Sequence, residues 1–296
     1  IDPLREAIVM SLETAFGPEM NIFEETPEHA RRVIVSSPVL SHSKFAQLKQ
    51  IDLPGYGFEV IDLNYAESEG LQAAIQRICA QAEAAVRAGR SQLVLSDRAI
   101  QPGFLPISAL MATGAVHHHL MNAGWRCDAN IIVETGFARD PHHFAVLIGF
   151  GASAVYPYLA YDIIADMARN GEILGDPLEA QGYFRKGIDK GLLKIMSKMG
   201  ISTIASYRGA QLFEAVGLDS VVVETCFKGV PSRIQGANFA DIEGDQRLLA
   251  DDAWKARKSL DQGGLLKFVY GKEYHAFNPD VINTLHTAVR SGNYTD

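Results

Sequence analysis

The feature that most constrains the fold is an alternation of short apolar runs with helix-like segments, which continues from residue 33 to residue 223. The apolar runs have the composition of buried strands: Val33–Ser36, Phe58–Leu63, Leu93–Leu95, Ile131–Val133, Ala154–Tyr156, Thr203–Ala205 and Val221–Val223. Strands that alternate with helices form a parallel sheet whose two faces are covered. We therefore predict an α/β fold with a parallel sheet of about seven strands, either barrel-like (an incomplete β/α barrel) or partly open.

The segments between these runs carry apolar residues at helical spacing. We predict helices over Pro3–Phe16, Ser43–Gln50, Leu71–Ala88, Pro106–Ala123, Pro141–Ile148, Leu159–Asn170, Leu178–Met199, Ala210–Val216 and Pro279–Val289. The alternation ends after Cys226. We therefore expect an α/β core over residues 1–226. Residues 227–296 should form an irregular extension and a terminal helix that pack on the core or on a neighbouring domain.

Composition and charge argue against several classes of protein. The net charge of −8, without a Lys/Arg-rich stripe, disfavours a nucleic-acid partner, and no apolar run reaches the roughly 18 residues of a membrane span. The opening Ile1–Arg5 has no secretion signal and no initiator Met, which favours a fragment or a processed product. The cysteines, Cys79, Cys127 and Cys226, are odd in number and widely spaced. That pattern favours reduced thiols in the cytosol over disulfides or an iron–sulfur site.

Two groups of histidines, His117–His119 and His142–His143, are the most conspicuous candidate metal ligands. Consecutive residues of a helix point about 100° apart, so no two of the first three rings share a face on which they could chelate one ion. A zinc site would need ligands from the second group across the fold. We favour helix packing over metal binding and assign no metal ligands.

The sequence Gly149–Ala154 matches the G-x-G-x-x-A pattern of dinucleotide-binding loops. Such a loop follows a strand and opens a helix. Here a helix-like segment precedes the glycines and a strand-like one follows, so we interpret the segment as a helix-to-strand turn in which glycine provides positive φ.

No catalytic residues can be assigned from the sequence. It contains no G-x-S-x-G motif, and none of the cysteines has a base next to it. Polar residues do follow several strands, where parallel α/β folds bind ligands. Of these, Asp97 with Arg98, and Glu134 with Arg139, read as ion pairs that anchor loops.

A series of motifs nevertheless resembles one known family over essentially the whole chain. The motifs are Ala7–Leu12, Ser36–Leu40, Leu95–Arg98, Gly114–Leu120, Val133–Gly136, Asp140–Ala145, Lys198–Ser202, Ser206–Gln211 and Gly271–His275. In these segments, and in their order, the chain is similar to the central domain of the glutamate synthase large (alpha) subunit.

The resemblance implies a non-catalytic part of an enzyme that makes two L-glutamates from L-glutamine and 2-oxoglutarate. In that family a glutaminase domain releases ammonia, and a flavin domain with FMN and an iron–sulfur cluster uses it. Electrons come from NADPH or NADH, in some cases through a small subunit, or from ferredoxin. The implied partners are the glutaminase and FMN domains of the same polypeptide. We expect no cofactor on this fragment, and a cytoplasmic or plastid location.

The resemblance also carries four residue assignments. Ser36, Ser37 and Thr135 match positions beside the family's ammonia tunnel, and their hydroxyls could hydrogen-bond neutral ammonia without trapping it as ammonium. Met10 matches a methionine near the flavin, although core packing is the competing reading. Two other functions stay open: an independent flavin- or nicotinamide-dependent oxidoreductase on a β/α barrel, and a purely structural interaction module.

Overall fold

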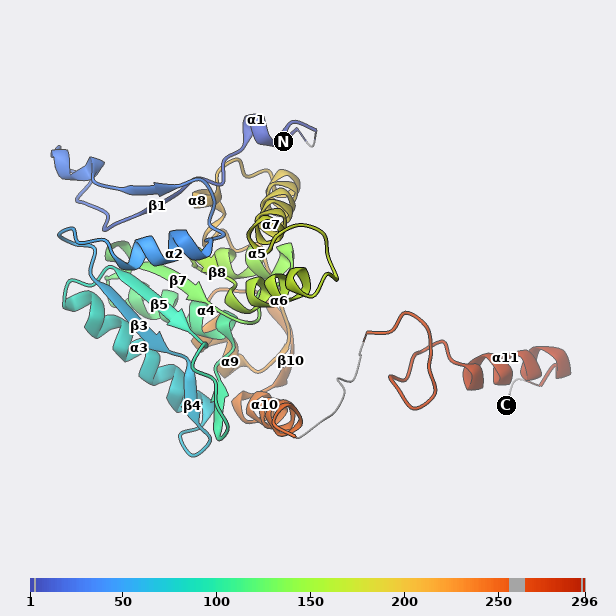
Figure 1. The fold of residues 1–296 in the computed structure, drawn as a ribbon. Coiled ribbons are helices and arrows are strands. Elements are labelled where there is room, and N and C mark those ends of the chain that lie inside the picture. The colour runs from blue at the N-terminus through green and yellow to red at the C-terminus, as the bar shows by residue number, and fades with distance from the viewer. Residues whose placement is uncertain (3, 256–263, 294, 296) are drawn as a thin grey trace. The chain divides into compact units, whose positions relative to one another are not determined.

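A computed structural model describes residues 1–2, 4–255, 264–293 and 295 (Figure 1). It divides the chain into two compact units, Ile1–Asp252 and Ala253–Asp296. The expected extension from residue 227 thus includes segments of the first unit.

The first unit is built on a parallel sheet of four strands, in the order β3-β5-β7-β8. Strands that follow one another in this order are neighbours in space, and their bounds are Phe58–Asp62, Gln92–Ser96, Asn130–Glu134 and Ala154–Tyr156. The predicted α/β class with a parallel sheet is confirmed, but the sheet has fewer strands than the seven expected.

Three segments that were predicted as strands of the parallel sheet have other structures. Val33–Val35 is a strand, β2, but it pairs antiparallel with β1 (Thr14–Phe16) outside the parallel sheet. The predicted strand at 203–205 instead leads into the short helix α8 (Ile204–Tyr207). Val221–Val223 lies within helix α9 (Ser220–Cys226), because Asp219 accepts the N–H of Val221 at 2.8 Å and caps a helix there.

Two predicted helices are also wrong. At the amino terminus the helix α1 covers Glu6–Val9 alone, since Thr14–Phe16 is drawn into the hairpin with β2. The segment 210–216 is irregular up to β9 (Ala215–Leu218), which pairs in parallel with β10 (Ser232–Ala237).

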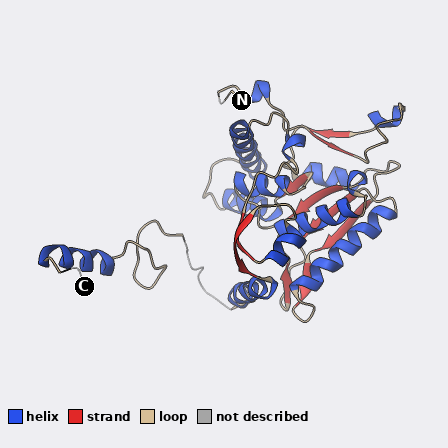
Figure 2. Ribbon diagram, turned by 180° about the vertical axis from the view of Figure 1, so that it is seen from behind, coloured by secondary structure: helices blue, strands red, loops and turns tan. Residues whose placement is uncertain are grey.

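Helices cover both faces of the sheet (Figure 1; Figure 2 from behind). One face packs against α3 (Leu71–Arg87), α4 (Ala109–Asn122) and α5 (Pro141–Gly149) in the larger hydrophobic cluster. On the other face, Val94 and Ile132 join a second cluster with Phe45 of α2 (His42–Lys49). Alternate residues of one strand thus enter two different cores, which fixes the register of the sheet.

Two further helices of this unit follow strand β8. Helix α6 (Tyr158–Arg169) follows β8, and α7 (Pro177–Met199) packs against α5 and α6. Within the edge strand β8, Val155 donates its N–H to the carbonyl of Pro38 at 2.8 Å, and its carbonyl accepts the N–H of Leu40 at 3.0 Å. The segment after β2 therefore extends the sheet by one short parallel bridge.

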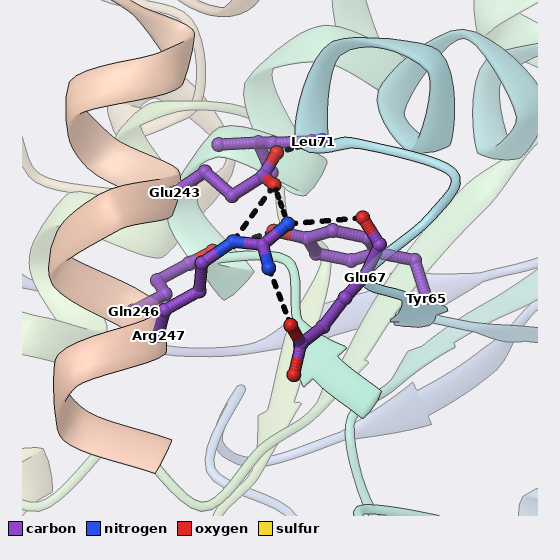
Figure 3. Close-up of polar contacts among 6 residues, drawn as sticks. All are labelled: Tyr65, Glu67, Leu71, Glu243, Gln246 and Arg247. Atoms are coloured by element: carbon purple, nitrogen blue, oxygen red, sulfur yellow. Dashed lines mark hydrogen bonds and ion pairs between the residues drawn. The ribbon is translucent and has the colours of Figure 1, made fainter. Parts of the chain in front are cut away.

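Helix α10 (Phe239–Ala253) is attached to the first unit by polar side chains (Figure 3). Glu243 accepts the backbone N–H of Leu71 at 2.6 Å, and Gln246 accepts from the Tyr65 hydroxyl at 2.9 Å. Arg247 forms ion pairs with Glu243 and with Glu67. These contacts reach β4 (Asn64–Ala66) and the start of α3; the adjacent strand β6 (Phe104–Pro106) pairs antiparallel with β4.

The second unit contains the helix α11 (Pro279–Ser291), close to its predicted bounds. Asn278 caps it by accepting the N–H groups of Asp280 and Val281 at 2.9 and 3.1 Å. Gly292, with φ of 68°, ends it in the left-handed conformation that glycine favours.

Candidate functional site

The polar residues that follow β5 and β7 meet at the carboxyl end of the sheet. Asp97, 3% exposed, comes directly after β5, and Thr135 and Gly136 come after β7. The Thr135 hydroxyl donates to Asp97 Oδ2 at 2.5 Å, and the Gly136 N–H donates to Oδ1 at 3.0 Å. Adjacent parallel strands end at one edge, so the sequence places these groups side by side.

Burial and hydrogen bonding act in opposite directions on Asp97. Burial raises the pKa of its carboxyl because the charged form loses water, while hydrogen bonds from Thr135, Tyr158 and Gly136 lower it and leave a net increase. Burial and the nearby Asp97 charge raise the pKa of Tyr158. The carboxylate is thus surrounded by donors that belong to the protein itself.

A second carboxylate, Glu134, lies next to this one. It accepts a hydrogen bond from the Ser96 hydroxyl at 2.7 Å and lies 3.7 Å from a guanidinium nitrogen of Arg98. Arg98 also stacks over the Tyr158 ring at 4.6 Å. The ion pairs expected from the sequence are therefore rearranged: Arg98 pairs with Glu134, whereas Asp97 is held by hydroxyls and a backbone N–H.

A cavity of about 810 Å³ opens beside Asp97 and Gly136. Its walls come from the loop after β7, from α4 and α5, and from the segment that contains β9 and α9. Most of the lining is apolar, with four phenylalanines: Phe137, Phe150, Phe213 and Phe227. The size falls within the range of small-molecule sites, and the position is one where parallel α/β folds bind ligands.

The three predicted tunnel residues lie in different surroundings. Ser36 is exposed. Ser37 is buried; its hydroxyl donates to Asp189 of α7 at 2.5 Å and accepts the N–H of Val39 at 3.0 Å. Thr135 is fully buried in the Asp97 network. Ser37 and Thr135 therefore serve two separate hydrogen-bond networks, one centred on the partly buried Asp189 and the other on the buried Asp97.

Met10, the predicted flavin neighbour, is 8% exposed and belongs to the larger hydrophobic cluster of the first unit. The next residue, Ser11, donates its N–H to the carbonyl of Ser202 at 2.8 Å. Met10 thus has the surroundings of a core residue in this chain.

The rings of the histidine triplet have separate partners. His117 accepts a hydrogen bond from Arg126 at 2.8 Å, and burial and the Arg126 charge lower its pKa to about 3. His118 packs edge-on against His117, and His119 lies 2.8 Å from Glu83. Across the described residues, no three His, Cys, Asp or Glu side chains are grouped to hold a metal ion.

The glycine segment is the helix-to-strand turn that the sequence predicts. Helix α5 ends at Gly149, β8 begins at Ala154, and Gly151 between them has φ of 117°. A Cβ on Gly151 would lie 2.4 Å from the His117 ring. This close approach, as well as the positive φ, requires glycine here.

Sequence reasoning missed Tyr158 of the Asp97 network and Asp189, the partner of Ser37. Tyr158 follows β8 and Pro157, so the rule that singled out Asp97 and Thr135 could have found it. Asp189 lies within the long helix α7, and nothing in its local sequence shows that it accepts a hydrogen bond from the Ser37 hydroxyl 152 positions away.

No helix among the described residues is both long enough and apolar enough to span a membrane.

Comparison with known proteins gives a consistent set of relatives. The family described as "Glutamate synthase central domain" matches residues 1–219. The NADH glutamate synthase of Schizosaccharomyces pombe is 39% identical over 99% of this chain, which spans 14% of that protein. Ferredoxin-dependent glutamate synthase 1 of Arabidopsis thaliana is 40% identical over the whole chain, which spans 19% of that protein.

Similarity to solved structures is weaker. The recombinant flavin-binding domain of baker's yeast flavocytochrome b2 matches 77% of this chain and 47% of its own, with 16% identity and a TM-score of 0.37.

Proposed function

The chain belongs to the glutamate synthase central domain family, and from this premise we propose that it is a non-catalytic domain that walls part of an ammonia passage in a larger polypeptide. The polypeptide would make two L-glutamates from L-glutamine and 2-oxoglutarate, with a glutaminase domain and an FMN and iron–sulfur domain as the partners of this one. Its location would be the cytoplasm or a plastid, in keeping with the chloroplastic or mitochondrial Arabidopsis relative.

The electron donor is a property of the other domains in this proposal. The two relatives are named for NADH and for ferredoxin, yet they are 39% and 40% identical to this chain. Equal similarity to enzymes with different donors supports a central domain that does not select among NADPH, NADH and ferredoxin.

The observation that carries the conduit role is the hydrogen bond from Thr135 to Asp97. An unscreened carboxylate beside an ammonia passage would bind ammonium and hold it there. Asp97 instead receives hydrogen bonds from Thr135, Gly136 and Tyr158 and has little exposed surface. Thr135 is therefore proposed to screen a carboxylate that would otherwise retain the guest.

The two serines have different roles in this proposal. Ser37 donates to the partly buried Asp189, so its hydroxyl binds that carboxyl as Thr135 binds Asp97. Ser36 is exposed, and among the described residues its hydroxyl has no hydrogen-bond partner, so it is the free hydroxyl that could contact ammonia.

The test uses the intact enzyme that carries this domain. Thr135→Val should leave glutamine hydrolysis active but release part of the ammonia into solution, measured as ammonia set free per glutamate formed. Thr113→Val is the matched control, because Thr113 is equally buried but bonds only within its own helix, to the carbonyl of Ala109 at 2.7 Å. Unchanged coupling in Thr135→Val would reject the assignment.

The cavity is the one observation that favours an independent oxidoreductase. Its charges, however, suit a phosphate-bearing cofactor poorly: Asp97 and Glu214 line it as acids, and Arg139 is the single arginine or lysine among the lining residues. We therefore derive no step through FMN or a nicotinamide in this domain. Stoichiometric binding of either cofactor by the chain, followed in a fluorescence titration, would favour the independent oxidoreductase over the non-catalytic domain.

A further inference from the structure

Three arginines from distant parts of the chain gather at the amino ends of β7 and β8. Arg126 donates to the carbonyl of Gly151 at 2.8 Å, and Arg208 donates to the hydroxyl of Ser153 at 3.1 Å. Gly151 and Ser153 belong to the same turn before β8. The charge of Arg208 acts on Arg126, and that of Arg32 acts on Arg208, lowering the pKa in each case. Arg126 and Arg208 thus hold the same turn. The β1–β2 hairpin beside Arg32 contacts the segment around Arg126, because the Asn130 amide donates to the carbonyl of Gly17 at 3.1 Å and the N–H of Glu19 donates to the carbonyl of Cys127 at 3.2 Å.

None of these three arginines forms an ion pair with a described carboxylate. Arg126 uses its donors on neutral acceptors: His117 at 2.8 Å and the carbonyls of Ala129 and Gly151 at 2.6 and 2.8 Å. Other arginines of this unit do pair with glutamates, as Arg77 does with Glu69 at 2.7 Å. Arg169, which also lacks an ion pair among the described residues, is exposed, whereas all three arginines of this cluster are partly buried.

Arg32 provides the second observation. Its Nε is buried and has no hydrogen-bond partner among the described residues. A buried donor without an acceptor is unfavourable, and more so when it carries charge. The charge of Glu19, an exposed residue, raises the pKa of both Arg126 and Arg208, but Glu19 forms no ion pair with a described residue.

A partly buried positive cluster whose members form no ion pair is unfavourable, because each charge loses water and repels the others. Burial accordingly lowers the pKa of Arg126 to about 10. Arginine is the side chain best suited to bind the paired oxygens of phosphate or carboxylate groups, through its planar fork of donors.

We propose that Arg32, Arg126, Arg208 and the Ser153 hydroxyl form a binding site for an oxyanion of the phosphate or carboxylate type. Arg32 and Arg208 retain unused donors and contact the anion directly. Arg126, whose nitrogens are all bonded to protein acceptors, contributes charge and fixes the turn at Gly151.

The site is separate from the cavity described above. The cavity lies at the carboxyl ends of the strands, beside Asp97 and Gly136, whereas Ser153 precedes β8 and Arg126 precedes β7. Binding here would leave the Thr135 network untouched, so the inference does not depend on the proposed function.

The experiment follows thermal unfolding of the chain in sodium phosphate and in sodium succinate, against sodium chloride at equal ionic strength. A bound anion should raise the melting temperature saturably by about 2–4 °C. Arg32→Gln and Arg208→Gln should each weaken the apparent affinity at least tenfold. Arg169→Gln, an exposed arginine at the end of α6, is the matched control and should keep the full response.

Arg32→Gln has a second readout that separates the site from a folding defect. In chloride alone it should melt no lower than the parent chain, because it removes one of three mutually repelling charges.

Comparison with the intact polypeptide then identifies the source of the anion. A response in both proteins indicates a free anion, and a response of the chain alone indicates a carboxylate of the same polypeptide. No anion-specific response in the chain, or equal responses in all variants, would overturn the proposal.

Discussion

The carboxylate of Glu243 accepts the backbone N–H of Leu71 at 2.6 Å, across 172 positions of the sequence (Figure 3). Leu71 is the first residue of α3, and Gly70 before it provides no side chain to cap that helix. The first N–H groups of a helix need acceptors from elsewhere, and a negative charge there also complements the helix dipole. Glu243 of α10 fulfils both needs, and Arg247 holds it in place.

The first prediction concerns this long-range cap. Glu243→Ala should lower the free energy of unfolding by about 1–2 kcal/mol, the usual effect of losing a helix cap. Urea denaturation followed by circular dichroism measures it. Asp245→Ala, an exposed change on the same helix, should stay within about 0.5 kcal/mol. Equal effects of the two changes would show that α10 contributes through propensity rather than through the cap.

The same carboxylate makes stability depend on pH. Burial raises the pKa of Glu243, but hydrogen bonds from Arg247 and Leu71 outweigh it and leave the pKa lowered. A lowered pKa in the folded state gives stability that is present above the pKa of the unfolded chain and is lost as pH falls through the folded value. The parent chain should therefore exceed Glu243→Gln in stability at pH 7, and the difference should shrink below about pH 4. A pH-independent difference would contradict this.

Long segments with strong periodicity could be predicted from the sequence, whereas several short ones could not. Helices α3 and α7 have long amphipathic patterns, and they form within two residues of their predicted bounds. The three valines Val221–Val223 are compatible with a strand or with a buried helix. They form a helix because Asp219 caps its first turn. Thr14–Phe16 became a strand because a tertiary partner, β2, overrode its helical spacing.

The candidate site divides in the same way. Asp97 and Thr135 could be expected to meet because each follows a strand of the parallel sheet. The arginine cluster could not be expected from the sequence, since Arg32 and Arg208 lie far apart in it and neither belongs to a motif with a known spacing. Their proximity depends on tertiary structure.

A second pair of substitutions tests the turn before β8. Gly151→Ala should cost at least about 2 kcal/mol, because Gly151 has φ of 117° and its new Cβ would lie 2.4 Å from His117. Gly182→Ala, in the middle of α7 with nothing within 4 Å of its Cβ position, should instead stabilise by about 0.5–1 kcal/mol. Chemical denaturation measures both, and effects of the same sign would refute the steric argument.

The last prediction concerns Thr135 as a structural donor within the chain itself. Thr135→Val removes its hydrogen bond to Asp97 and leaves the N–H of Phe137 without the acceptor that now lies at 3.1 Å. The loss should be about 1–3 kcal/mol at neutral pH, against less than about 1 kcal/mol for Thr113→Val.

The difference between these variants should grow as pH rises, because Thr135 stabilises the ionised form of Asp97. Burial gives Asp97 a raised pKa in the folded state, so its contribution to stability is greatest below the pKa of the unfolded chain and is lost as pH rises through the folded value. Without the Thr135 hydroxyl that pKa rises further, and ionisation costs more. Denaturation of both variants at about pH 4 and at neutral pH provides the measurement. A Thr135→Val penalty that is constant across this range would mean that the hydroxyl serves Phe137 and not the carboxylate.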